Sequence, residues 1–161
     1  MGQDLSRSLH TLTARLDRAA DQILRTEAGL SYSRFLTLFM IGSAGADTQR
    51  ALAERLGVTE PSVSRMTHAL EKAGLVKAVA DPAGGNRHQL SLTPAGAQVV
   101  TRWGRLLENR LAALVDASGV PYREYEEYTK RLLEALDAAG PAAGPPPTVK
   151  HTIPARKPAT T

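Results

Sequence analysis

The first part of the chain alternates apolar and polar positions with the period of an amphipathic helix. Its apolar residues recur at spacings of 4, 3, 4, 3 and 4 positions and are Leu5, Leu9, Leu12, Leu16, Ala19 and Ile23. This a/d repeat forms a narrow stripe, which is typical of a helix that packs against a partner helix. We therefore predict a dimerisation helix over about residues 4–28. The alternative is a core helix of a monomeric bundle.

A second helical pattern follows Gly29. Leu30 and Ser31 have the character of a hydrophobic staple and an N-cap. The apolar positions after them fit one face of a helix and are Tyr32, Phe35, Leu36, Phe39 and Met40. Glycines at positions 42 and 45 predict where this helix ends. We interpret it as a core helix.

Two short helical patterns come next, separated by a tight turn. We expect Thr48 to cap the first helix and Gly57 to end it in the left-handed conformation. Thr59 is placed to cap the second, Pro61 lies in its first turn, and Gly74 ends it. Two helices joined by such a turn predict a helix-turn-helix, in which the second helix enters the major groove of DNA.

A β-hairpin is predicted after the helix-turn-helix. Residues 75–80 and 88–93 read as strands, with Leu90 and Leu92 on one face of the second. The intervening residues 81–86 are rich in turn formers. The hairpin would be the wing of a winged-helix fold.

The C-terminal part of the chain contains two more amphipathic helices and a proline-rich tail. Thr93 and Pro94 predict the start of a long helix that ends near residues 118–119. Its apolar stripe consists of Val99, Trp103, Leu106, Leu107, Leu111, Leu114 and Val115. A last helix is expected over about 121–139. We predict a disordered basic tail over 140–161, because six of its residues are proline.

Composition narrows the class of protein. The 161 residues suit one folded domain over residues 1–139, mainly α-helical with a small hairpin. Without cysteine, disulfides, thiolate zinc sites and thiol switches are excluded. The net charge of +4 depends largely on the tail, so overall basicity says little about nucleic acid. With no secretion signal and no long apolar run, we expect a cytoplasmic protein that does not enter a membrane.

The residues give no support for an enzyme. The four histidines do not pair at the helical spacing of metal ligands, and the hydrolase and phosphate-binding motifs that we sought do not occur. We therefore expect neither a metal nor a cofactor.

The second helix of the helix-turn-helix has two distinct faces. On a helical wheel the inward face carries Val63, Met66, Leu70 and Ala73. The outward face, which we call the reading face, carries Pro61, Ser64, Arg65, His68 and Lys72. An arginine can donate two hydrogen bonds to guanine, and serine can bind a base or a phosphate. An ordinary solvated helix surface is the alternative interpretation.

Several motifs resemble the MarR family of transcriptional regulators over about Leu5–Ala139. They are Leu52-Ala53-Glu54-Arg55-Leu56-Gly57-Val58, Ser62-Val63-Ser64-Arg65, Leu70-Glu71-Lys72-Ala73-Gly74-Leu75-Val76 and Leu92-Thr93-Pro94-Ala95-Gly96. The resemblance implies a homodimer built from residues 4–28 and 94–139, and a DNA-binding lobe over about 46–93. It implies DNA contacts by the reading face together with Thr48, Thr59 and Ser62.

The wing departs from the family pattern. The acidic-arginine-arginine motif of the family falls on Gly84-Gly85-Asn86, which leaves Arg87 as the nearest basic candidate for a minor-groove contact. A merely more flexible hairpin is the alternative.

The resemblance also implies a small aromatic or phenolic effector. Residues that would line its cleft are His10, Tyr32, Phe35 and Trp103, although each also suits a core or an interface. We therefore expect a regulator that binds double-stranded DNA as a homodimer on a pseudo-palindromic operator. We expect a repressor, with an activator as the alternative, and the resemblance implies that a small-molecule ligand relieves its binding to DNA. The alternative is a winged-helix module that binds protein and no specific DNA.

Overall fold

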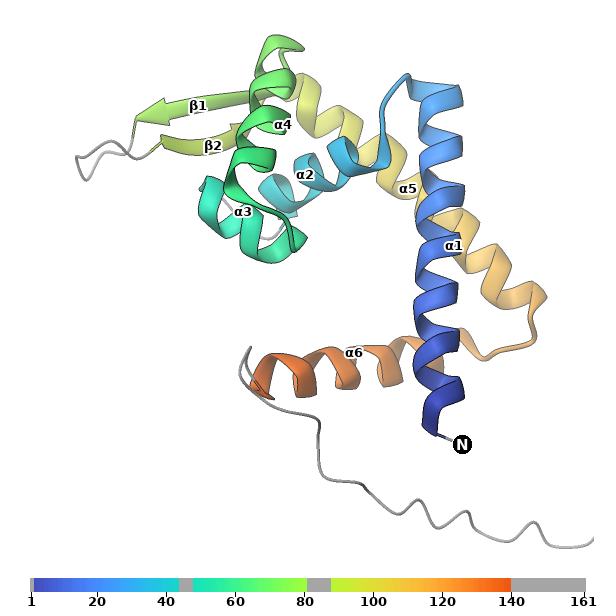
Figure 1. Ribbon diagram of the computed structural model, residues 1–161. Helices are drawn as coiled ribbons and strands as arrows, with labels where there is room; N and C mark the ends of the chain where they lie inside the picture. Colours follow the sequence, from blue (N-terminus) through green and yellow to red (C-terminus); the bar gives the residue numbers. More distant parts are fainter. Residues whose placement is uncertain (1, 44–47, 81–87, 140–161) are drawn as a thin grey trace, which may run out of the picture. The chain divides into compact units, whose positions relative to one another are not determined.

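The computed structural model describes residues 2–43, 48–80 and 88–139, which divide into two compact units with the boundary between Ala113 and Leu114. The described chain forms six helices and one two-stranded hairpin (Figure 1). The elements are α1 (Gly2–Ala28), α2 (Tyr32–Ser43), α3 (Gln49–Leu56), α4 (Glu60–Lys72), β1 (Val76–Ala80), β2 (His88–Leu92), α5 (Pro94–Ala117) and α6 (Tyr122–Ala139). The predicted mainly helical fold with a small hairpin is confirmed.

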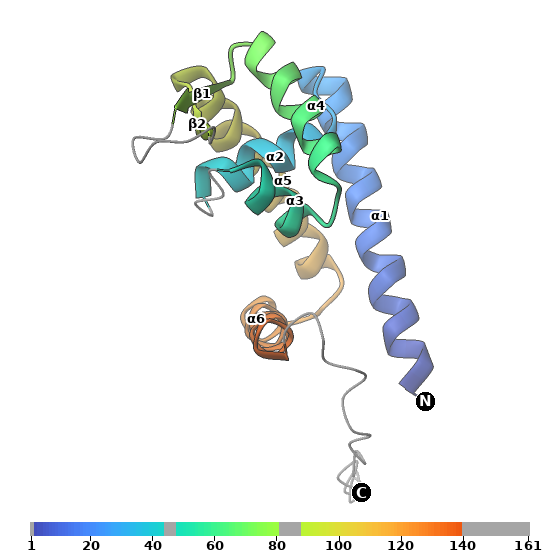
Figure 2. The same cartoon turned by 60° about the vertical axis from the view of Figure 1, so that its left-hand side comes forward.

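The first unit has one apolar core to which almost every element contributes. Figures 1 and 2 show α2 beside α3 and α4. The core residues are Leu24 and Leu30, Phe35, Leu38 and Ile41 of α2, Leu52 and Ala53 of α3, Val63 and Leu70 of α4, Val76 and Leu90 of the hairpin, and Trp103 of α5. Burying a leucine or phenylalanine side chain contributes about 1.5–3 kcal/mol. This core therefore fixes where the outer face of α4 lies.

Glycines and threonines define the ends of the short helices. Thr48 caps α3, because its Oγ1 accepts a hydrogen bond from the Ala51 N–H at 3.1 Å. Gly57 ends α3 with φ of 65°, and the Val58 N–H then reaches back to the Ala53 carbonyl at 3.1 Å. Gly74, with φ of 71°, follows α4. The helix boundaries expected from these residues are confirmed.

Hydrogen bonds join the residues before β1 to the start of α5. β1 and β2 pair antiparallel, with Val76 opposite Leu92. Thr93 donates from its N–H to the Leu75 carbonyl at 3.0 Å and from its hydroxyl to the Gly74 carbonyl at 2.6 Å. A Cβ at Gly96 would lie 2.0 Å from that Leu75 carbonyl oxygen, so glycine permits the close approach.

Several amphipathic positions remain exposed. In α1 the side chains of Leu5, Leu9 and Leu12 are exposed, whereas Leu24, which the predicted a/d stripe omitted, is fully buried. In α6 no residue is buried. Leu114 is half exposed, which corrects its assignment to the inner stripe of α5.

Three ion pairs of the described residues join positions four apart on one helix. They are Asp21–Arg25, Arg50–Glu54 and Glu126–Lys130. Asp21 also accepts the Tyr32 N–H at 2.8 Å, so it links the end of α1 to the start of α2. The hydrogen bond from Arg25 and then that from Tyr32 lower the pKa of Asp21. None of the described helices is long and apolar enough to cross a membrane.

Candidate nucleic-acid interface

The reading face of α4 lies on the outside of the first unit. Its five members, Pro61, Ser64, Arg65, His68 and Lys72, are all exposed. On the opposite side Val63 and Leu70 are buried and Met66 is half-buried. Ala73 is exposed, which corrects its assignment to the inner face, because the helix ends one residue earlier at Lys72.

A buried threonine that the helical-wheel analysis did not single out helps to anchor α4. The Thr67 hydroxyl is positioned to donate to the carbonyls of Val63 at 3.0 Å and Ser64 at 3.1 Å, so its burial leaves no unsatisfied polar atom. Thr67 lies four residues after Val63 and three before Leu70, and this spacing is the signal that would have found it. The inner face is thus continuous along the helix.

The start of α4 corrects the expectation for Thr59. Thr59 is the N-cap residue, but its side chain makes no capping hydrogen bond. Instead the N–H groups of Ser62 and Val63 both bind the Thr59 carbonyl, at 3.0 and 3.1 Å. The Thr59 hydroxyl pairs with the Ser62 hydroxyl at 3.0 Å, and the Arg65 guanidinium donates to that Ser62 oxygen at 3.4 Å.

Other predicted DNA-binding residues have different environments. Thr48 is half-buried and its oxygen is committed to capping α3. Arg87 and the Gly84-Gly85-Asn86 motif lie outside the described residues, as does the tail over 140–161. Within the described hairpin, Lys77 of β1 is an exposed cation that sequence analysis did not single out.

The structure packs three of the four predicted ligand residues together and leaves His10 exposed on α1. His10 is exposed on α1, about 20 Å along the helix from the buried Leu24. Tyr32 and Phe35 stack with their ring centroids 6.4 Å apart, and burial raises the pKa of Tyr32. Phe35 and Trp103 belong to the apolar core. Three of the four are therefore packing residues of the first unit.

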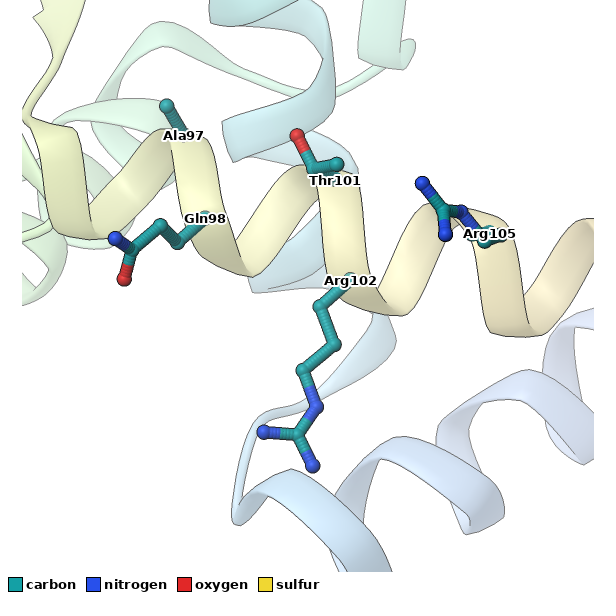
Figure 3. Close-up of a pocket in the computed structure, with 5 residues that line it drawn as sticks. All are labelled: Ala97, Gln98, Thr101, Arg102 and Arg105. Carbon is teal, nitrogen blue, oxygen red and sulfur yellow. The ribbon is translucent and has the colours of Figure 1, made fainter.

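Two neighbouring open pockets on α5 share Arg102 and Arg105. The larger, about 550 Å³, is lined by Ala97, Gln98, Thr101, Arg102 and Arg105 (Figure 3). The smaller, about 240 Å³, adds Trp103 and Glu27 to the two arginines. Figure 3 shows Arg102 extended away from α5, with Gln98 on the same side. Its guanidinium lies 4.8 Å from the Trp103 ring centroid, a cation–π distance. This surface favours an anion.

No cluster suited to a metal ion occurs among the residues that the structure describes. Such a cluster would need at least three histidine, cysteine, aspartate or glutamate side chains. The exposed side chains of α4 offer hydrogen bonding and positive charge.

Comparisons with known proteins place the described geometry in context. The model of the MarR family matches residues 28–85, which span α2, the helix-turn-helix and β1. Comparison with curated protein sequences gives no match.

Solved structures share the fold. The transcriptional regulator BldR from Sulfolobus solfataricus is 22% identical, with a TM-score of 0.73 over 85% of this chain and 95% of its own. Wild-type MarR from E. coli is 22% identical, with a TM-score of 0.69 over 82% and 96%. The S. aureus MepR–DNA complex is 23% identical, with a TM-score of 0.66 over 83% and 96%. This chain is similar to each of them in fold.

Proposed function

We propose that this chain, whose residues 28–85 match the model of the MarR family, is a transcriptional regulator of that family that binds duplex DNA through α4. The observation that carries the proposal is the division of α4 into a buried apolar face and an exposed face bearing Ser64, Arg65 and His68. A helix anchored on one side presents the other to the major groove with little freedom to tilt.

The reading face offers two kinds of contact. We assign the exposed Arg65 and His68 to base edges, where a bidentate arginine–guanine pair contributes about 1–3 kcal/mol of discrimination. Ser64, Pro61 and Lys72 are assigned to the backbone or flanking bases, and Thr48 to a phosphate near the start of α3. Backbone contacts supply affinity and its dependence on salt, whereas base contacts supply specificity.

We assign the exposed apolar faces of α1 and α6 to a homodimer. The stripe of α1 exposes Leu5, Leu9 and Leu12, and the exposed side chains of α6 include Leu132 and Leu136. A two-fold dimer would present two copies of α4 to half-sites about one helical turn apart, hence a pseudo-palindromic operator. Bound over a promoter in the cytoplasm, such a dimer would exclude polymerase and act as a repressor.

Selection from a random duplex-DNA library at near-physiological salt tests the function. Recovery of an inverted repeat supports the dimeric regulator and supplies the operator for further work. Weak binding without enrichment, which salt abolishes, would support the alternative of a winged-helix module that binds protein.

Arg65 tests the role of the reading face. We expect Arg65→Ala to weaken binding to the selected duplex by about 5- to 150-fold, with a much smaller effect on unrelated duplex DNA. Arg34→Ala, which removes an exposed arginine of α2, is the matched control. An equal loss on both duplexes would make Arg65 a phosphate contact instead.

We further propose that a small aromatic or phenolic molecule relieves DNA binding. The arginines and Trp103 of the α5 pockets favour a ligand that carries a carboxylate beside its ring. Phenolic carboxylates should release the selected duplex from the wild-type protein and act less on Arg102→Gln. The absence of any effect on either DNA affinity or melting temperature would refute ligand relief.

A further inference from the structure

Three helices of the first unit begin directly after a threonine, and two of these threonines make the usual capping contact. The Thr48 hydroxyl oxygen accepts from the Ala51 N–H at 3.1 Å at the start of α3. The Thr93 hydroxyl oxygen accepts from the Gly96 N–H, also at 3.1 Å, at the start of α5. In both helices the residue at the third helical position has no polar side chain.

Thr59 makes a different set of contacts. Pro61 has no N–H to offer, and the Ser62 N–H is bound to the Thr59 carbonyl at 3.0 Å. The third helical position of α4 holds a serine, whose hydroxyl lies 3.0 Å from the Thr59 hydroxyl. The Thr59 hydroxyl, at the capping position of α4, thus binds a side chain in place of a backbone N–H.

Arg65 completes a chain of hydrogen bonds with this pair. Its Nη2 donates to the Ser62 oxygen at 3.4 Å. The two hydroxyl groups can make both contacts at once. One of them donates its hydrogen to the other, and the Ser62 oxygen still has a lone pair that accepts from Arg65. Among the ion pairs of the described residues none involves Arg65, so no carboxylate competes for its guanidinium there.

We propose that Ser62, supported by Thr59, is a positioning residue that holds the Arg65 guanidinium in its reading orientation before DNA arrives. The proposal rests on the DNA-binding function proposed above and assigns Ser62 a role through Arg65, in place of a direct phosphate contact. A long side chain restrained in the free protein loses less conformational freedom on binding, which strengthens contact with the matching base.

Side-chain NMR relaxation of Arg65 in the free protein tests the positioning without any DNA. We expect Ser62→Ala to increase the fast motion of the Arg65 Nε–Hε group, and Thr59→Val to do so less. Ser62→Thr keeps a hydroxyl and should retain the restraint. Thr48→Val, at the cap of α3, is the matched control that should leave Arg65 unchanged. Unchanged motion of Arg65 in Ser62→Ala would overturn the proposal.

A double-mutant cycle on the duplex recovered by selection tests the consequence for binding. We expect Ser62→Ala to weaken binding about three- to tenfold in the wild-type background, the range of an exposed hydrogen bond, and to have no effect on Arg65→Ala. An equal loss in both backgrounds, with a shallower salt dependence, would show that Ser62 contacts a phosphate and overturn the proposal.

Failure of the two proposals can be told apart. If no duplex is enriched, the proposed DNA-binding function fails, while the relaxation experiment still decides whether Ser62 restrains Arg65. If a duplex is enriched and the cycle shows no coupling, only the positioning role fails.

Discussion

Helices α3 and α4 of the first unit and helix α6 are all amphipathic, but their leucine side chains differ in burial. Leu52 and Leu70 are 0% and 1% exposed, whereas Leu132 and Leu136 of α6 are 62% and 70% exposed. A leucine stripe in a sequence therefore indicates that an apolar surface exists without indicating what covers it. Helices α3 and α4 bury their apolar residues within the core of the first unit, whereas α6 keeps its leucines exposed, as the proposed homodimer would require.

The largest loss of stability is expected when a buried core leucine is removed. We expect Leu70→Ala to lower the free energy of unfolding by about 2–5 kcal/mol, because it removes a fully buried side chain and leaves a cavity. Urea unfolding followed by circular dichroism measures the loss, which should not depend on protein concentration. A loss below about 1 kcal/mol would mean that this core is not the one that stabilises the fold.

Charging α6 should separate the proposed dimer while leaving the first unit folded. We expect the double variant Leu132→Glu/Leu136→Glu to raise the dimer dissociation constant by at least about 100-fold, since two unpaired carboxylates would be buried at the interface. Sedimentation equilibrium measures the association. Glu134→Gln, an exposed change on the same helix, is the control. A dimer that survives the double variant would remove α6 from the interface.

The first unit should also respond to loss of a working helix cap. We expect Thr48→Ala to destabilise the protein by about 1 kcal/mol, because the Ala51 N–H loses its acceptor. Thr59→Ala should cost only a few tenths, as its side chain caps nothing. Equal losses in thermal unfolding would contradict the difference between the two threonines.

The smallest effect is expected at the joint between α1 and α2. Because the pKa of Asp21 is lowered in the folded protein, its contribution is present above the unfolded value of 3.8 and is lost as pH falls through the lower folded pKa. Asp21→Asn should flatten the dependence of melting temperature on pH in that acidic range. An unchanged slope would show that the Arg25 and Tyr32 contacts do not persist in solution.

Local signals explain why most helix ends could be predicted from sequence. Gly57 adopts a positive φ value and Thr48 caps α3, both as expected, and Gly74 follows the end of α4 as expected. The Thr59 side chain does not cap α4, because Pro61 has no N–H to donate and the Thr59 hydroxyl pairs with the Ser62 hydroxyl instead. Such competition depends on three-dimensional geometry, which residue spacing does not report.

The candidate site was predictable in part for the same reason. The exposed reading face follows directly from helical periodicity, and every one of its members is exposed. The link between Ser62 and Arg65 was not predicted, because it depends on side-chain conformations. The burial of Leu24 depends on how the end of α1 meets the core, and the a/d stripe does not include it.

The placement of charges has a practical consequence for binding measurements. The ion pairs Asp21–Arg25, Arg50–Glu54 and Glu126–Lys130 each lie within a single helix, on its surface. Exposed pairs of this kind contribute little to stability, and salt weakens them further. A salt titration can thus be carried to high ionic strength with the fold intact, and its slope then counts the phosphates that the protein neutralises.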